Sequence, residues 1–325
     1  MANVNVECRG FTGAYQNVNG IHIRNFRRRA IFRATMTVGF QRFSGFLNFG
    51  VRGLVHRFGI ALSAFSFLER QKSGLCISNE YENLDTSEMG AATYWYGMVF
   101  AKLAAESELR IRWLAHVDVM KKSGALTTSS TSKKRGDLVG RGLNNDWHVI
   151  EAKGRTDPYS SSLVTDAKDQ ALAVKKIKGV PPATTSACIA SLHTQPVSVL
   201  LDDPPAETGE GTEEWEIDDK KYFRQYYKGI IEYLQEFGSE NSRTTDDSKF
   251  VTAPLFPFYE EYFSLSTIRP LPEWRLELGL QTEIFKNPEV AVEVVNEFIE
   301  SENGEVGSDG IAIFGEMPDW ETNLE

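Results

Sequence analysis

The stretch "GDLVGRGLNNDWHVIEAKG", residues 136–154, decides the fold, because it predicts two strands joined by a short turn. The segment "RGLNND" supplies the turn residues. Three charged side chains, Asp137, Glu151 and Lys153, interrupt these otherwise apolar strands. A buried hairpin has no packing use for two carboxylates and an ammonium, so the stretch is either a solvated structural edge or a reaction site.

The register of this hairpin places the two carboxylates face to face. If the turn is symmetric about Asn144, Asp137 lies directly across from Glu151, with Cβ atoms about 5 Å apart. Two carboxylates this close repel unless a positive charge lies between them. A cation that prefers oxygen ligands, Mg²⁺ or Mn²⁺, is the simplest such charge. Lys153 projects from the same face as Glu151, about 7 Å further along the strand, where its ammonium can reach a water or a phosphate oxygen. The alternative is an ordinary ion cluster on a solvated sheet.

Predicted helices and strands surround the hairpin in a definite order. Asp85 and Glu88 form a capping-box pattern that predicts a helix over residues 86–107. Strands are expected within 109–120, 136–140 and 147–154, a helix within 160–179 that ends at Gly179, and further strands within 186–193 and 197–203. The order is therefore helix, three strands, helix, and one or two strands.

This motif in this order resembles the PD-(D/E)XK nuclease superfamily, which has the restriction-endonuclease-like fold. Gly136-Asp137 stands where the family often has Pro-Asp, and Glu151-Ala152-Lys153 matches the D/E-x-K element. The resemblance covers residues 81–204 and implies an α/β (α+β) protein with an αβββαβ core on a mixed central sheet. It also implies a Mg²⁺-dependent endonuclease, in which Asp137, Glu151 and the carbonyl of Ala152 hold the metal and Lys153 orients the attacking water.

Two further residues are candidates on the same resemblance. Many members carry an acidic metal ligand on the first helix, where Glu88 precedes Ala92 of the inward stripe, although Glu88 also serves as the capping partner of Asp85. Gln170 lies on the helix face expected to pack on the sheet, and in some relatives a Gln there lies beside the active site. A buried amide needs a hydrogen-bond partner.

The flanking regions differ sharply in charge. Residues 1–75 contain 11 Lys and Arg against 2 acidic residues, a formal charge of +9 in a chain whose total is −10. The basic region, residues 1–80, is Gly- and Phe-rich, with strands expected in 20–26 and 29–40, and its "RNFRRRAIFR" suits phosphates and stacked bases. The alternative is that these arginines pair with the acidic C-terminal region, residues 205–325, which would pack on the core or regulate it. That region is expected to contain helices in 219–237 and 287–301, a strand in 309–315 and a loose tail.

Composition and motifs narrow the function classes. No apolar run reaches the roughly 20 residues of a membrane span, and no secretory leader opens the chain, so we expect a soluble, cytoplasmic protein without a membrane partner. Cys8, Cys76 and Cys188 lack the spacing of a zinc or redox motif, and no Walker-type phosphate loop is present.

The expected partner is nucleic acid, with DNA favoured over RNA, and a homo-oligomer or a regulatory protein partner stays open. Restriction or antiphage defence is the role suggested by analogy. The alternatives are a catalytically inactive nucleic-acid-binding module on the same fold, and an interaction or scaffold protein.

Overall fold

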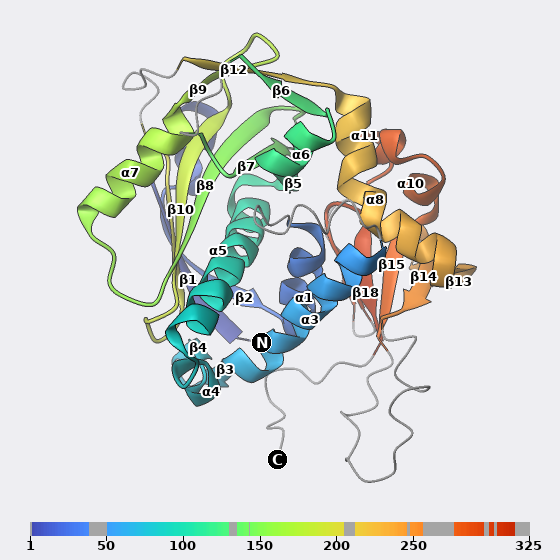
Figure 1. Ribbon diagram of the computed structural model, residues 1–325, viewed down its shortest axis with the longest axis horizontal. Coiled ribbons are helices and arrows are strands. Elements are labelled where there is room, and N and C mark those ends of the chain that lie inside the picture. The colour runs from blue at the N-terminus through green and yellow to red at the C-terminus, as the bar shows by residue number, and fades with distance from the viewer. Residues whose placement is uncertain are drawn as a thin grey trace.

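A computed structural model describes residues 2–38, 51–129, 135–142, 144–204, 212–245, 248–255, 276–295, 299–301 and 304–315. The chain has a mixed α/β fold with a seven-stranded and a six-stranded sheet (Figure 1). Within these residues, no helix combines the length and the apolar character needed to cross a membrane.

The seven-stranded sheet contains the predicted hairpin. Its strands lie in the order β2 (Gly20–Phe26), β1 (Ala2–Arg9), β11 (Ser198–Asp202), β10 (Thr184–Ser191), β8 (Trp147–Arg155), β7 (Leu138–Gly142) and β5 (Ile111–His116). Strands β8 and β10 are parallel, as are β1 and β11, and the other neighbours are antiparallel. The sheet is therefore mixed, as the sequence predicts, and the N-terminal region extends it by two strands.

The hairpin register agrees with the prediction. Leu138 pairs with Ile150 and Val139 with Val149, which is the register of a hairpin symmetric about Asn144. One residue further from the turn on each strand, Asp137 therefore lies opposite Glu151.

Helices α5 (Thr86–Leu109) and α7 (Ser161–Leu172) cover opposite faces of this sheet. Ile150 and Ala152 of β8 belong to the apolar cluster that contains the α5 side chains, whereas α7 packs Val164 against Ile189 and Leu200. Because side chains alternate along a strand, Glu151 points to the face that α7 covers.

The predicted helix over 86–107 is confirmed, with the side chain of Asp85 accepting hydrogen bonds from the backbone of Ser87 and Glu88. The predicted helix over 160–179 is too long. It ends at Leu172, and the chain continues as strand β9 (Val174–Ile177), which pairs with β12 (Glu213–Ile217); β12 pairs in turn with β6 (Leu126–Thr128). Gly179, at φ +79°, belongs to the turn after β9 and not to a helix terminus. The predicted strand over 109–120 divides into β5 and helix α6 (Val117–Lys122).

The N-terminal region contains more helix than the sequence pattern predicts. A strand was expected in 29–40, but helix α1 (Arg28–Thr37) forms there, and residues 39 and 40 lie outside the described residues. Every residue of α1 is buried, its three arginines included, so packing between other elements fixes this helix. Helix α3 (Val51–Phe67) follows, and Figure 1 shows α1 and α3 between α5 and the C-terminal sheet. The smaller elements here are η1 (Gly13–Val18), β3 (Leu68–Gln71), β4 (Gly74–Ile77) and α4 (Asn79–Glu82).

The C-terminal region begins with α8 (Asp219–Phe237), whose bounds match the prediction. The six-stranded sheet has the order β13 (Ser239–Thr245), β14 (Ser248–Pro254), β15 (Glu277–Gln281), β18 (Ile311–Phe314), β17 (Gly304–Val306) and β16 (Ile299–Ser301). The expected strand in 309–315 is β18. The expected helix over 287–301 is wrong: short helices α10 (Thr282–Lys286), η4 (Pro288–Val290) and α11 (Ala291–Val294) occur there, then β16, with 296–298 outside the described residues. The tail predicted after residue 316 also lies outside them.

Several N-terminal arginines pair within the chain. The buried guanidinium of Arg33 lies between three carboxylates, 2.8 Å from Glu106, 3.2 Å from Glu305 and 3.6 Å from Asp309. Arg24 makes two hydrogen bonds to Glu108, at 2.6 and 2.7 Å. The alternative of pairing with the acidic C-terminal region therefore describes Arg33, through Glu305 and Asp309, whereas the partner of Arg24, Glu108, lies in the predicted core.

Candidate functional site

The predicted site residues Asp137, Glu151 and Lys153 converge at the open end of the β7–β8 hairpin. The backbone N–H of Asp137 donates a hydrogen bond to Oε2 of Glu151 at 3.1 Å. The other carboxylate oxygen of Glu151 forms an ion pair with Nζ of Lys153. Three residues that are 14 and 2 positions apart in sequence therefore share one polar cluster on one face of the sheet.

The cluster is buried at its centre and open at its edge. The side chain of Glu151 has no exposed surface, whereas 28% of the Lys153 side chain is exposed and Asp137 is half-buried. The accessible side of the cluster is therefore that of Lys153 and Asp137.

The electrostatics of the cluster leave it short of positive charge. Burial and the neighbouring charge of Asp137 raise the pKa of Glu151 to about 7, even though Lys153 acts in the opposite direction. Burial also raises the pKa of Asp137, against the opposing effects of Lys153 and a backbone hydrogen bond from Ala152. One ammonium does not offset two buried carboxylates, and a divalent cation at this point would.

The oxygen donors present fit a hard cation. The N–H of Ala152 is directed to the Asp137 carboxylate. Since the N–H and C=O of one strand residue point to the same side, the Ala152 carbonyl points that way as well. Two carboxylates and one carbonyl are the type of ligand set that Mg²⁺ and Mn²⁺ prefer.

Glu88 and Gln170 do not join this cluster. Glu88 is exposed in the first turn of α5, on the helix that packs against Ile150 and Ala152, so the expectation that it faces inward is wrong. Gln170 is half-buried, and its amide donates to the carbonyl of Asp166 in its own helix at 3.3 Å. The positions of α7 that do pack inward are Val164, Ala167 and Ala171, which places Gln170 to one side of the buried stripe.

Four residues near Asp137 were not predicted as part of a site. The carbonyl of Asp137 accepts a hydrogen bond from Val117 at 2.8 Å, and Arg135 forms an ion pair with Asp118 beside it. His116 pairs with Leu138 in the register of β5 and β7, and burial lowers its pKa to about 4. Strand β5 pairs with β7. Extending the predicted register of the hairpin to this neighbouring strand would therefore have placed the end of β5 beside Asp137.

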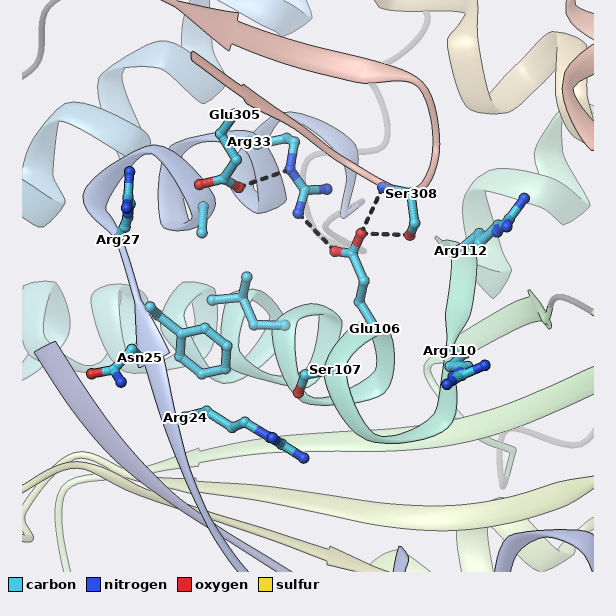
Figure 2. A pocket seen from close by; sticks show the side chains of 13 residues that line it. Arg24, Asn25, Arg27, Arg33, Glu106, Ser107, Arg110, Arg112, Glu305 and Ser308 are labelled. Atoms are coloured by element: carbon cyan, nitrogen blue, oxygen red, sulfur yellow. Dashed lines mark hydrogen bonds and ion pairs between the residues drawn. The ribbon is translucent and has the colours of Figure 1, made fainter. Parts of the chain in front are cut away.

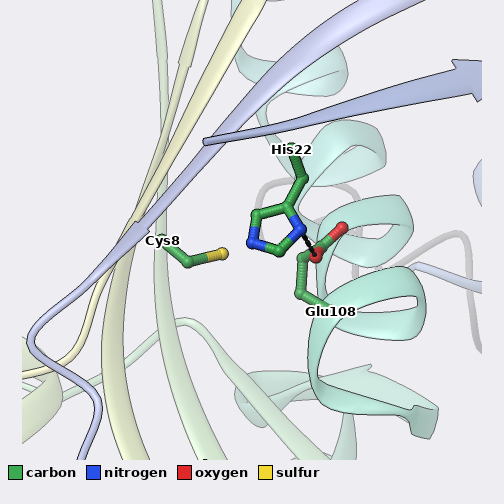
Figure 3. A group of neighbouring side chains, drawn as sticks. All are labelled: Cys8, His22 and Glu108. Carbon is green, nitrogen blue, oxygen red and sulfur yellow. Dashed lines mark ion pairs between the residues drawn. The ribbon is translucent and has the colours of Figure 1, made fainter. Parts of the chain in front are cut away.

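A second polar cluster brings together residues that are far apart in sequence. Ligand atoms of Cys8, His22 and Glu108 all lie within 4.8 Å of one another, and Figure 3 shows the imidazole between the thiol and the carboxylate. Sequence spacing gave no signal for this group, because the pairing of β1 with β2 and the packing of α5 assemble it.

This second cluster is better explained as an ion-pair network than as a metal site. Both oxygens of Glu108 already accept hydrogen bonds from Arg24, whose Nη2 also lies 3.2 Å from Nδ1 of His22. Burial raises the pKa of Cys8 to about 12, so its sulfur stays protonated. A metal ion here would have to displace a guanidinium and deprotonate a buried thiol.

Comparisons with protein-family models, with curated proteins and with solved structures found no match to this chain. The functional argument therefore rests on the geometry and chemistry of the Asp137–Glu151–Lys153 cluster.

Proposed function

We propose that this protein is a metal-dependent nuclease that hydrolyses phosphodiester bonds, with DNA favoured over RNA. The observation that carries the proposal is the convergence of Asp137 and Glu151 at a buried point where the pKa of Glu151 is raised to about 7. A fold keeps two carboxylates in such a place at a cost in stability, and perturbed acids of this kind concentrate at functional sites.

The arrangement of the elements supports a restriction-endonuclease-like core. The chain order α5, β5, β7, β8, α7, β10 follows the αβββαβ order of that family, and β5, β7, β8 and β10 are neighbours in one mixed sheet. The Asp precedes the second of these strands, and the Glu-x-Lys lies on the third, as in the family motif.

In the proposed mechanism, Asp137, Glu151 and the carbonyl of Ala152 would hold Mg²⁺ or Mn²⁺. The bound cation would supply Lewis acidity, which lowers the pKa of a water and offsets charge on the phosphate. Lys153, partly exposed beside Glu151, orients the attacking water and stabilises the negative charge that grows on the phosphate oxygens. Attack breaks the bond from phosphorus to the 3′ oxygen, by analogy with the family, and leaves a 5′-phosphate and a 3′-hydroxyl.

The substrate would approach from the exposed side of Lys153. Arg155 continues the same face of β8 and is half-buried, so it offers a second cation for the phosphate backbone. The arginines of "RNFRRRAIFR" make a smaller contribution than the sequence suggests, because Arg24 and Arg33 are engaged by carboxylates. Target choice, oligomerisation or restraint in a restriction or antiphage role would come from the flanking regions.

Cleavage assays on single- and double-stranded DNA and RNA, with Mg²⁺ or Mn²⁺ and with chelator, test the proposal. We expect metal-dependent cleavage that Glu151→Gln and Lys153→Met abolish. The matched control is Glu214→Gln, which removes a carboxylate from an exposed pair with Lys176, 3.2 Å apart on another sheet, and should leave cleavage intact. Calorimetry with Mg²⁺ and Mn²⁺ should show one site that Glu151→Gln removes.

Two results would decide against the nuclease. If the folded protein binds no divalent cation and cleaves none of these polymers, the cluster is structural. If nucleic acid binds equally well to the wild type and to Glu151→Gln, with no cleavage by either, the chain is a binding module on the same fold.

A further inference from the structure

A cavity lies where helix α1, helix α5 and the C-terminal sheet meet. The chemistry of its lining differs from that of the carboxylate cluster. The cavity encloses about 390 Å³, within the range of small-molecule sites. Figure 2 shows β2 and α1 on one side, the end of α5 below, and the turn after β17 above. None of Asp137, Glu151 and Lys153 lines it.

The polar lining of this cavity is dominated by guanidinium groups. Five arginines line it, namely Arg24, Arg27, Arg33, Arg110 and Arg112. The carboxylates that also line it are Glu106 and Glu305. Glu108 and Asp309, which lie outside the lining, also pair with Arg24 and Arg33, so five guanidinium groups face four carboxylates and the cavity keeps an excess of positive charge.

The two carboxylates that line the cavity are already engaged. Glu106 accepts from Arg33 at 2.8 Å through one oxygen and from the backbone and hydroxyl of Ser308, at 3.0 and 2.6 Å, through the other. Glu305 accepts from Nε of Arg33 at 3.2 Å. Glu106 and Glu305 thus hold Arg33 and the turn at Ser308 in place, and so they stabilise one wall of the cavity.

Two arginines on the opposite wall are held in fixed orientations. Arg24 uses Nε and Nη2 for Glu108. Arg112 is buried and donates from Nη1 to the carbonyl of Val295 at 2.8 Å. Arg110 is exposed at the end of α5. Guanidinium groups fixed in this way match phosphate oxygens with little loss of side-chain entropy.

The rest of the lining is apolar. Phe26, Ala30 and Leu103 are buried and contribute to the wall. An inorganic ion would use only the arginines, whereas a ligand with both a phosphate and a flat organic part would use both kinds of surface.

We infer that this cavity binds a nucleotide, with the phosphate among the arginines and the base or sugar against Phe26, Ala30 and Leu103. This inference goes beyond the proposed nuclease and does not depend on it, because the cavity shares no residue with the carboxylate cluster. The lining comes from α1, α5 and the C-terminal sheet, so a bound nucleotide would stabilise the packing of these elements against one another.

Isothermal titration of the full-length protein in EDTA with AMP, GMP, CMP and UMP, and separately with inorganic phosphate and with adenosine, tests the inference. The chelator removes any contribution from a metal at Glu151. We expect at least one nucleotide to bind at least tenfold more tightly than phosphate or adenosine and to raise the melting temperature. Arg27→Gln and Arg110→Gln, at half-buried and exposed positions, should each weaken its affinity about tenfold.

The matched control is Arg224→Gln on α8, which removes an exposed guanidinium that pairs with Glu289 of η4 and should leave affinity unchanged. Glu151→Gln should also bind normally. Circular dichroism establishes that each variant is folded. No binding of any nucleotide, equal affinity for phosphate and nucleotides, or unchanged affinity in the folded double variant Arg27→Gln/Arg110→Gln would each overturn the inference.

Discussion

Replacement of Glu151 by Gln should make the protein more stable at alkaline pH while it abolishes function. The pKa of Glu151 is raised from 4.5 to about 7 in the folded protein. The folded state therefore binds more protons than the unfolded state between these values, and the free energy of unfolding falls as the pH rises through this window. A displacement of this size corresponds to about 3 kcal/mol. This figure already includes the opposing attraction of Lys153, so we expect the neutral amide to make the protein about 3 kcal/mol more stable at pH 8.

Urea denaturation of wild type and variant from pH 4 to pH 8 measures this difference. The gain should be present at pH 8, shrink below pH 7, and vanish near pH 4, where Glu151 is protonated in both states. Saturating Mg²⁺ at pH 8 should stabilise the wild type, by about 2.7 kcal/mol at a hundredfold excess over the dissociation constant, and leave the variant unchanged.

Glu106→Gln is the matched control, because burial is common to both acids but the pKa of Glu106 is lowered to about 2 by Arg33 and Lys102. Its stabilising effect is present above pH 4.5 and is lost as the pH falls toward 2, so this variant should be about 3 kcal/mol less stable than the wild type at pH 8. If both variants destabilise the protein equally at pH 8, the reasoning about Glu151 is refuted.

Three further predictions concern single substitutions. Lys153→Met should reduce the rate of single-turnover cleavage at least about a hundredfold. Calorimetry should still detect Mg²⁺ binding to this variant, because the ammonium competes with the cation for Glu151. Intact cleavage would exclude Lys153 from the mechanism. Gly154→Ala should lower the free energy of unfolding by about 3 kcal/mol, because the Cβ of the new alanine would lie 2.0 Å from the carbonyl oxygen of Thr93 on α5. An unchanged urea midpoint would show that α5 can move away from β8. Arg33→Met should cost about 3 to 5 kcal/mol, because it removes the buried guanidinium that pairs with Glu106, Glu305 and Asp309. A loss under about 1 kcal/mol in the same assay would show that the Arg33 network contributes little.

The hairpin could be predicted from sequence because its information is local. A short turn between two apolar strands fixes the register, and the register fixes which side chains face each other. The predicted opposition of Asp137 and Glu151 follows from the same pairing that joins Leu138 to Ile150. The order of α5, β5, β7, β8, α7, β10 and β11 was predictable for the same reason, whereas α6, β6 and β9, which lie between them, were not predicted.

Features that depend on tertiary packing were not predictable in this way. The segment at 28–37 lies wholly buried between other elements, and its burial depends on tertiary contacts that the local sequence does not specify. Gln170 was assigned to the buried face by extending the helical stripe to Val174, but the helix ends at Leu172 and the stripe runs through Val164, Ala167 and Ala171. The cluster of Cys8, His22 and Glu108 depends on contacts between residues up to 100 positions apart in sequence.

Two buried charged clusters of this protein, around Arg33 and around Glu151, differ in how ionisation affects stability. Around Arg33, the guanidinium together with Lys102 lowers the pKa of Glu106, so ionisation there stabilises the fold. Around Glu151, burial and a second carboxylate raise the pKa, so ionisation opposes folding. A cluster that only joined β7 to β8 would gain stability from an apolar pair at the same positions. Local arrangements that cost stability without benefit to packing are typical of functional sites. A divalent cation is the addition that would reverse the sign at Glu151, which is why the metal-dependent reaction, rather than an ion pair at a sheet edge, is the function that this geometry supports.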